Sequence, residues 1–254
     1  MIFKIYILKL KIYLKKLKVK TILKKVLSLM NYKIRIVHQN SNEIAFLHIS
    51  KTAGTQIMHI IKQLKKLKIN IVRHDHWVKL SDLPTNTKYF FSIRNPATRF
   101  VSGFYFRRRK KNHSQHEKIT FKHFEHANDL AENLFTKGKV GVSARNAIQS
   151  IKHNAMLQVD WFQRYSYFEL RPPITIIRQE HFNTDMQRLL GLLNVNLEIS
   201  SLLSNDSDIT HKNEYKDLPR LSEKALKNLE RWYLQDYMFY EMCENWLREN
   251  HHIQ

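Results

Sequence analysis

Short apolar runs alternate with amphipathic segments through most of this 254-residue chain. Runs typical of buried strands lie at 44–49, 69–72, 88–93 and 174–177. Between them, apolar residues recur at helical spacing, as in Ile57, Ile60, Ile61 and Leu64. Strands that alternate with helices favour a parallel sheet covered on both faces. We therefore predict an α/β fold, a doubly wound parallel sheet flanked by helices, in a single domain.

The second half of the chain is predicted to be mainly helical. Two or three helices are expected over 120–168, and they contain Asn154, Gln158 and Trp161. Ser222 is typical of a helix cap, so one long final helix is expected to follow it. The basic and polar stretch from Arg107 to about Thr120 is predicted to be solvated.

One strand-to-helix junction has the composition of a phosphate site. The first apolar run breaks into Ser50-Lys51-Thr52-Ala53-Gly54-Thr55, small and hydroxyl-bearing residues around one lysine. A helix N-terminus after a tight loop offers free backbone N–H groups and the positive end of the helix dipole. Lys51 adds a mobile charge, and Thr52 and Thr55 add hydroxyl donors. The nucleotide-binding pattern G-x-x-x-x-G-K-[ST] has its lysine after the glycines, whereas Lys51 precedes Gly54, so this junction is P-loop-like without being that motif.

A second basic residue ends another predicted strand. Arg94 follows the run at 88–93, and Asn95-Pro96 is typical of a helix start with Asn95 as the cap. Ser102 follows within that helix. A guanidinium fork together with a hydroxyl suits a phosphate dianion.

Both segments resemble motifs of the carbohydrate sulfotransferases, which use 3′-phosphoadenosine 5′-phosphosulfate (PAPS). His48-Ile-Ser-Lys-Thr-Ala-Gly-Thr55 resembles their 5′-phosphosulfate loop, and Arg94 to Ser102 resembles their 3′-phosphate motif, Arg-Asp-Pro-x-x-Arg-x-x-Ser. Asn95 stands where the family has Asp, a near-isosteric change that keeps the helix cap. The resemblance implies PAPS as co-substrate, with Ser50 to Thr55 at its 5′ end and Arg94 and Ser102 at its 3′-phosphate.

A third segment, His74-Asp75-His76, lies between these two in sequence. It resembles the His-Gly-His of heparan sulfate 2-O-sulfotransferase, whose second histidine takes the acceptor proton. The resemblance implies that His76 is the catalytic base, with His74 beside it. An unperturbed histidine pKa near 6.5 suits that role at neutral pH. Asp75 departs from the family's glycine, and it either raises the pKa of a neighbouring histidine or faces away.

Two later segments resemble the family more weakly. Ile209-Thr-His-Lys-Asn213 resembles the loop that closes over the nucleotide, so Lys212 is expected to bind the cofactor. Arg178 to Asp185 resembles the strand-to-helix segment that supports the sheet there. With gaps, the similarity runs from about Glu43 to Trp246.

Charge and cysteine content bear on partners and compartment. Of the net charge of +21, residues 1–40 contribute +11, from eleven Lys/Arg and no acid. This stretch lacks the roughly 20 uninterrupted apolar residues of a membrane span, and is predicted as a basic extension of a sulfotransferase domain over 41–254. It either docks on an anionic membrane through snorkelling lysines or is passive. Cys243 is the single cysteine, so we expect a reducing, cytoplasmic location, with membrane association through the extension as the open alternative.

The resemblance implies an enzyme that transfers a sulfonyl group from PAPS to a hydroxyl of a carbohydrate or polysaccharide acceptor, and no metal is expected. Histidines between His113 and His126 have metal-like spacing but no acidic cage, which favours a solvated surface. One alternative, a P-loop kinase, needs a magnesium-holding acid at a strand end, and the strand at 88–93 ends in arginine. The other is a non-enzymatic binder of nucleic acid or another anionic polymer through Arg107 to Lys111, with nucleic acid the less expected partner.

Overall fold

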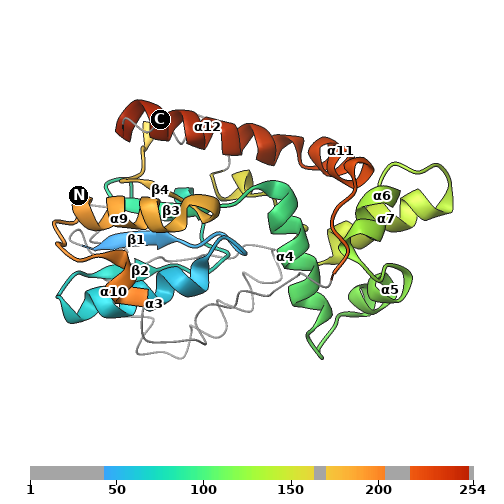
Figure 1. The fold of residues 1–254 in the computed structure, drawn as a ribbon, viewed down its shortest axis with the longest axis horizontal. Helices are drawn as coiled ribbons and strands as arrows, with labels where there is room; N and C mark the ends of the chain where they lie inside the picture. Colours follow the sequence, from blue (N-terminus) through green and yellow to red (C-terminus); the bar gives the residue numbers. More distant parts are fainter. Residues whose placement is uncertain (1–42, 163–169, 204–217, 252–254) are drawn as a thin grey trace, which may run out of the picture. The chain divides into compact units, whose positions relative to one another are not determined.

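The computed structural model describes residues 43–162, 170–203 and 218–251 (Figure 1). Its centre is a four-stranded parallel sheet with the strand order β2-β1-β3-β4. The strands are β1 (Ile44–Leu47), β2 (Ile71–Arg73), β3 (Tyr89–Ile93) and β4 (Ile176–Arg178). The predicted α/β fold with a helix-flanked parallel sheet is confirmed.

Three helices pack on one face of the sheet, namely α3 (Gly54–Lys66), α9 (Phe182–Leu192) and α10 (Ile199–Leu203). Alternation along the strands turns Phe46 and Phe90 to this face, where their rings stack with centroids 5.0 Å apart. The apolar stripe of α3, with Ile57, Ile60 and Leu64, is fully buried against them. The helical spacing of apolar residues in the sequence therefore correctly predicted the buried face of α3.

The other face is covered by α12 (Leu234–His251). Phe91 points to this side, and its ring lies 4.6 Å from Phe162 and 6.2 Å from Phe239 of α12. A second helical group continues the fold beside the sheet, comprising α4 (Pro96–Arg108), α5 (Gln115–His123), α6 (Ala127–Asn133), α7 (Lys139–Ser150) and α11 (Glu223–Trp232). Helix α4 links the two regions, since it begins at the end of β3 and packs into the second core through Phe100 and Phe104.

The prediction of one long final helix is wrong. Ser222 caps α11, as predicted, by accepting from the Ala225 N–H at 3.1 Å. The helix then breaks at Tyr233, whose buried ring points inward and whose hydroxyl donates to the Asn154 carbonyl at 2.9 Å. Helix α12 starts from there at a new direction (Figure 1).

The prediction for residues 107–168 also needs correction. Helix α5 begins inside the stretch expected to be solvated, because Ser114 and Glu117 form a capping box. Arg107 is not solvated either, since it makes two hydrogen bonds to the buried Glu117 carboxylate, at 2.6 and 2.7 Å. Asn154 and Gln158 lie in turns after α7, next to a 3₁₀ segment at Val159–Trp161, rather than within helices.

Some predicted features lie outside the described residues. These are the extension at 1–40 and the loop at 209–213 with Lys212. None of the helices that the structure describes is long and apolar enough to cross a membrane. Short 3₁₀ segments at Leu80–Asp82 and Gln179–His181 complete the described elements.

Candidate active site

Strand order places the candidate site at the carboxyl edge of the sheet. The chain leaves β1 toward β2 on one side, and β3 lies on the other side. Ligands of open α/β sheets bind where the strand order reverses in this way. Lys51 follows β1 and Arg94 follows β3, so these two predicted residues lie on adjacent strand ends.

The loop after β1 has a strained backbone. Lys51 and Ala53 have φ of 67° and 65°, in the left-handed region, which costs roughly 1–2 kcal/mol per non-glycine residue. Ala53 is the N-cap of α3, and no side chain caps that helix. The first N–H groups of α3 thus have no capping side chain and suit an anion.

Internal hydrogen bonds hold this loop. The Thr52 side chain is fully buried, and its hydroxyl donates to the Ile49 carbonyl at 2.8 Å. The Ser92 hydroxyl of β3 lies 2.7 Å away and is therefore the donor to Thr52. The Thr52 hydroxyl is thus engaged within the protein, whereas Thr55 is exposed at the start of α3.

Gly54 is required by the close approach of His48. A Cβ on Gly54 would lie 1.8 Å from Nε2 of the His48 ring. His48 is buried, stacks on Phe46 with centroids 5.2 Å apart, and burial lowers its pKa to about 3. The neutral His48 ring therefore forms the floor of the loop, a role that sequence reasoning missed although His48 begins the quoted motif.

His76 lies directly against this floor. Its ring centroid is 4.1 Å from that of His48, and its Nδ1 is 3.0 Å from the His48 carbonyl oxygen. A carbonyl can only accept a hydrogen bond, so Nδ1 carries the proton. Burial, together with Arg73 and Lys152, lowers the pKa of His76 below its ordinary value. At neutral pH the ring is neutral, with its lone pair on Nε2.

His74 has different surroundings. Its backbone N–H donates to the Phe46 carbonyl at 3.0 Å, and its side chain is buried. Burial lowers its pKa, although the negative charges of Asp75 and Glu43 act to raise it. Glu43 lies at the opposite end of β1 from Lys51. Asp75 is exposed and pairs with Arg73 at 3.1 Å, so its carboxylate faces solvent.

Lys51 sits among positive charges. Its Nζ lies 3.9 Å from the centroid of the Phe106 ring, and Lys110 approaches the same ring at 4.7 Å. Burial lowers the pKa of Lys51 to about 8, and the neighbouring cations Arg94, Arg109, Lys110 and Arg99 lower it further. Such a cluster is stabilised by an anion bound at its centre.

The predicted cap at Asn95 is confirmed. Its Oδ1 accepts from the N–H groups of Ala97 and Thr98 at 3.0 and 3.4 Å. The buried Gln158 side chain holds the Arg94 backbone from both sides, accepting from its N–H at 3.0 Å and donating to its carbonyl at 2.8 Å. The position of Arg94 is thus fixed by a residue 64 positions away.

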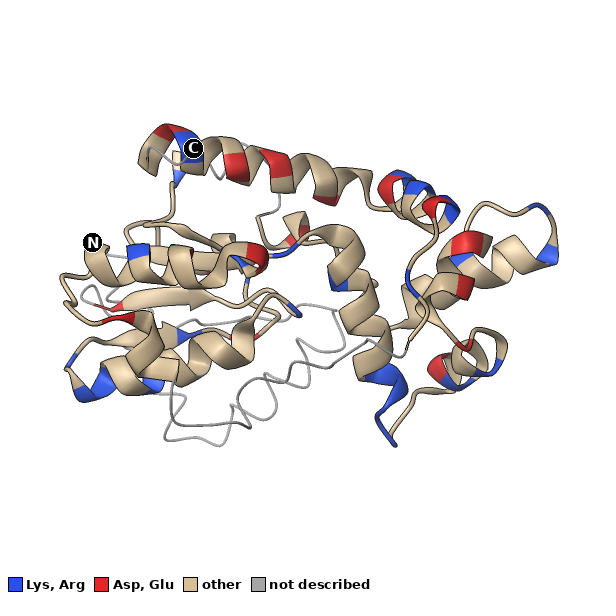
Figure 2. Ribbon diagram, viewed as in Figure 1, with Lys and Arg blue, Asp and Glu red and all other residues tan. Residues whose placement is uncertain are grey.

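One face of α4 turns toward the loop. Arg99 donates from Nε to the Ser50 carbonyl at 3.1 Å, and Phe106, seven residues later, contacts Lys51. Ser102 is buried on the same helical face between them. Figure 2 shows basic residues at the end of α4, where Arg107 and Arg108 lie in its last turn. The structure therefore brings both predicted phosphate motifs together.

Residues 35–242 match the model of the sulfotransferase family. The chain belongs to this family. A comparison with curated proteins gave no match. No group of three or more His, Cys, Asp or Glu side chains within the described ranges is arranged to hold a metal ion.

Sequence reasoning also missed His153 of this sulfotransferase. Its ring contacts Phe106 edge-on at 5.2 Å and lies 6.3 Å from His76. Burial, then Lys51 and His76, lowers its pKa to about 3, so it adds no charge at neutral pH. Nothing in the sequence near His153 indicates this placement. Arg99 was also given no role from the sequence, although it is the second arginine of the 3′-phosphate motif and could have been found there.

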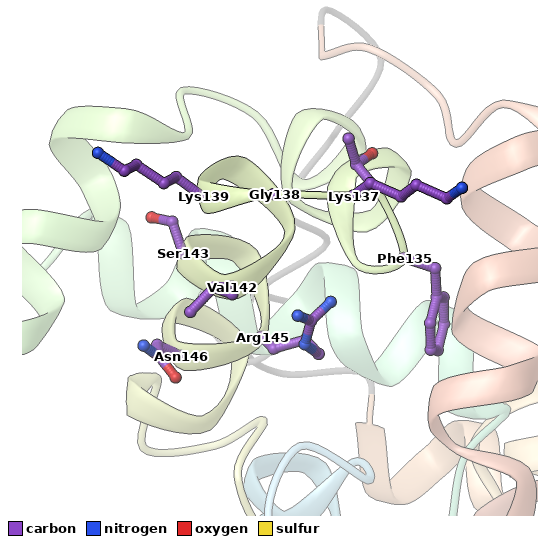
Figure 3. A pocket seen from close by; sticks show the side chains of 9 residues that line it. Phe135, Lys137, Gly138, Lys139, Val142, Ser143, Arg145 and Asn146 are labelled. Carbon is purple, nitrogen blue, oxygen red and sulfur yellow. The ribbon is translucent and has the colours of Figure 1, made fainter.

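Two cavities formed by the described residues of the sulfotransferase lie away from this edge. One of about 790 Å³ opens between α6 and α7 and is lined by Phe135, Lys137 and Arg145, among others (Figure 3). Another of about 460 Å³ lies at the opposite edge of the sheet, beside Ile44 and Tyr89. Neither includes Lys51 or His76, so charge and loop geometry locate the candidate site better than cavity volume does.

Proposed function

We propose that this sulfotransferase uses PAPS and sulfates a hydroxyl of a carbohydrate acceptor, as in the heparan sulfate 2-O-sulfotransferase branch. The carrying observation is Lys51, held among cations at a helix N-terminus that no side chain caps. A nucleoside with anionic groups at both its 5′ and 3′ positions fits a site with Lys51 at one end and Arg94 at the other.

Lys51 and the loop amides from Ser50 to Thr55 are assigned to the 5′ end. When bound, PAPS supplies the sulfonyl group, and its departure leaves growing negative charge on a phosphate oxygen. The Lys51 ammonium, positioned over Phe106 and surrounded by the cations of Arg94, Arg109 and Lys110, stabilises that charge. Arg94 and Ser102 are assigned to the 3′-phosphate, with Lys212 as a further contact outside the described residues.

His76 is assigned as the base. Its Nδ1–H is held by the His48 carbonyl, so Nε2 is the atom that accepts the acceptor proton. A pKa below the ordinary histidine value keeps the ring in its basic, neutral form at pH 7. His74 lies beside it, with a buried side chain and a backbone N–H that donates to the Phe46 carbonyl of β1.

A carbohydrate acceptor is supported by the surface next to His76. The neighbouring Trp77 is 50% exposed, and an exposed aromatic face can pack on the apolar face of a sugar ring. Lys152 Nζ lies 5.8 Å from the Trp77 ring, and both Lys152 and Arg73 act on His76. These cations suit an acceptor that carries an acidic group.

Ligand-dependent stabilisation tests the cofactor. A ligand that binds only the native state raises the melting temperature. 3′,5′-bisphosphoadenosine is expected to raise it clearly more than AMP does, and more than ATP with magnesium. Transfer of label from PAPS to a panel of glycans then tests the acceptor. Equal stabilisation by AMP and the bisphosphate would contradict the assignment of Arg94 and Ser102.

The cellular location of the enzyme is proposed from amino-acid composition alone. We place the enzyme in the cytoplasm, with contact between residues 1–40 and anionic membranes as the addition to test. The full chain should co-sediment with anionic vesicles at low salt and dissociate as salt rises. A chain starting at Ser41 should stay in solution. Equal behaviour of the two would make the extension passive.

A further inference from the structure

One buried carboxylate connects the two halves of the candidate site. Asp236 lies in the first turn of α12, and its side chain is fully buried. Its Oδ1 accepts from the backbone N–H groups of Gln158 and Val159 at 2.6 and 3.2 Å. Its Oδ2 faces Arg99 Nη1 at 3.6 Å. Asp236 thus contacts two segments that each lead to a phosphate motif.

The first connection runs through Arg99 to the 5′-phosphosulfate loop. Arg99 is also buried, and it donates from Nε to the Ser50 carbonyl and from Nη2 to the Ser50 hydroxyl, at 3.1 and 3.4 Å. A third bond, from Nη1 to the Met156 carbonyl at 3.0 Å, fixes the plane of the guanidinium. Arg99 is therefore occupied within the protein and holds the loop.

The second connection runs through Gln158 to Arg94. Because Asp236 holds the Gln158 backbone, it sets the position from which the Gln158 side chain grips both sides of the Arg94 peptide. Ser50 and Arg94 lie on different loops after different strands. Both are nevertheless connected to the same carboxylate, that of Asp236 in α12.

Stability alone gives a poor account of this pair. Burial lowers the pKa of Arg99 and raises that of Asp236 to about 6, in each case against the pull of the partner. Desolvation therefore outweighs the attraction, as is common for buried ion pairs, and such pairs contribute little net stability. Groups kept at that cost in an active site are candidates for a positioning role.

We propose that Asp236 is a positioning residue that fixes the spacing between the 5′-phosphosulfate loop and the Arg94 half of the site. This rests on the proposed function, because it takes a nucleoside with phosphates at both ends as the ligand. The distance between those phosphates is set by the ribose. A fixed spacing lets both halves engage one molecule, whereas a single phosphate binds its own half whatever the spacing.

The ratio of two dissociation constants isolates this effect. We define the 3′-phosphate gain as the Kd of AMP divided by the Kd of 3′,5′-bisphosphoadenosine, both measured by calorimetry. Asp236→Asn keeps an oxygen for the Gln158 and Val159 N–H groups but removes the charge facing Arg99. It should lower the gain about tenfold, as the loss of about 1.4 kcal/mol would, while the Kd of AMP changes little.

Two further variants separate positioning from general damage. Gln158→Met loosens the Arg94 connection without touching Asp236 and should also lower the gain; it decides the matter if Asp236→Asn does not fold. Asp185→Asn is the matched control, because Asp185 is another fully buried carboxylate paired with an arginine, Arg178, but not with the loop. It should lower the melting temperature and leave the gain at its wild-type value.

Each outcome is decisive. A wild-type gain in Asp236→Asn and Gln158→Met overturns the positioning role. An equal loss of gain in Asp185→Asn overturns it too, since the effect would then follow any destabilisation. If the wild-type protein itself prefers the bisphosphate no more than AMP, the proposed use of PAPS fails, and the positioning role fails with it.

Discussion

Two strand-to-helix junctions at the same edge of the sheet surround a basic residue with opposite electrostatic environments. Arg178 ends β4 and makes hydrogen bonds to both oxygens of the buried Asp185 carboxylate, at 2.9 and 3.0 Å. These bonds raise the pKa of Arg178. Lys51 follows β1, and burial together with the neighbouring cations Arg94, Arg109 and Lys110 lowers its pKa.

The difference separates structural from functional charge. At the β4 junction the protein supplies its own counter-ion, so the arginine contributes to folding. At the β1 junction the counter-ion is absent from the described residues, and an aromatic ring holds the ammonium instead. A cation whose charged form is disfavoured in a tight loop is a candidate for ligand binding or catalysis.

The largest expected effect is on activity at the β1 junction. His76→Ala removes the proposed base and should lower turnover by about 10²–10⁴-fold, while the affinity for 3′,5′-bisphosphoadenosine stays near wild type. His74→Ala is the control and should be milder, because the acceptor proton is assigned to His76 and not to His74. A dead His74→Ala with an active His76→Ala would shift the assignment by two residues.

The next effect is on stability, at the β4 junction. Arg178→Ala removes the guanidinium that pairs with the buried Asp185 carboxylate and leaves it the Arg188 side chain and the backbone N–H of residue 178. Breaking such a buried pair should cost about 3–5 kcal/mol of unfolding free energy. Denaturant titration measures it. Folded Arg178→Ala should still bind the bisphosphate, and a loss of stability below 1 kcal/mol would remove the contrast with Lys51.

Lys51→Ala should have the opposite pattern of effects, a large loss of activity without a loss of stability. Removing a preorganised charge aimed at the leaving group costs about 10²–10³-fold in turnover. The unfolding free energy should stay equal to the wild-type value or rise, because the substitution relieves repulsion from Arg94 and Arg99. Wild-type turnover in this variant would make the loop assignment wrong.

The sequence was sufficient for the fold and for part of the site. Apolar runs predict the strands because the sheet is buried on both faces, although the observed strands are shorter, as where the run at 174–177 becomes Ile176–Arg178. Lys51, His76 and Arg94 can be placed at one edge from the sequence, because each follows a predicted strand and parallel strands end at the same edge of a sheet.

The remaining features depend on tertiary contacts. His153 and Phe106 surround Lys51 and His76 only once α4 and the turn after α7 meet. The break at Tyr233 has no glycine or proline to indicate it, since it is set by the burial of the ring and its bond to Asn154. The contacts of Asp236 with Gln158 span 78 positions and carry no local pattern.

The smallest effect is a pH dependence that only the β1 junction should show. Lys51, with a pKa lowered to about 8, is charged below that pH and loses its proton above it. Affinity for the bisphosphate should therefore be flat near pH 7 and about tenfold weaker at pH 9, one unit above the pKa. Ligand phosphates are already dianionic there, since their second pKa is near 6.

Lys51→Arg supplies the control for this dependence. A guanidinium keeps its charge throughout this range, so the variant should bind with nearly constant affinity from pH 7 to pH 9, even if more weakly than wild type. Asp185→Asn at the β4 junction should retain the wild-type pH profile. A wild-type affinity that does not change with pH, or a Lys51→Arg profile parallel to it, would show that the titrating group is not Lys51. The charge contrast between the two junctions would then need another origin.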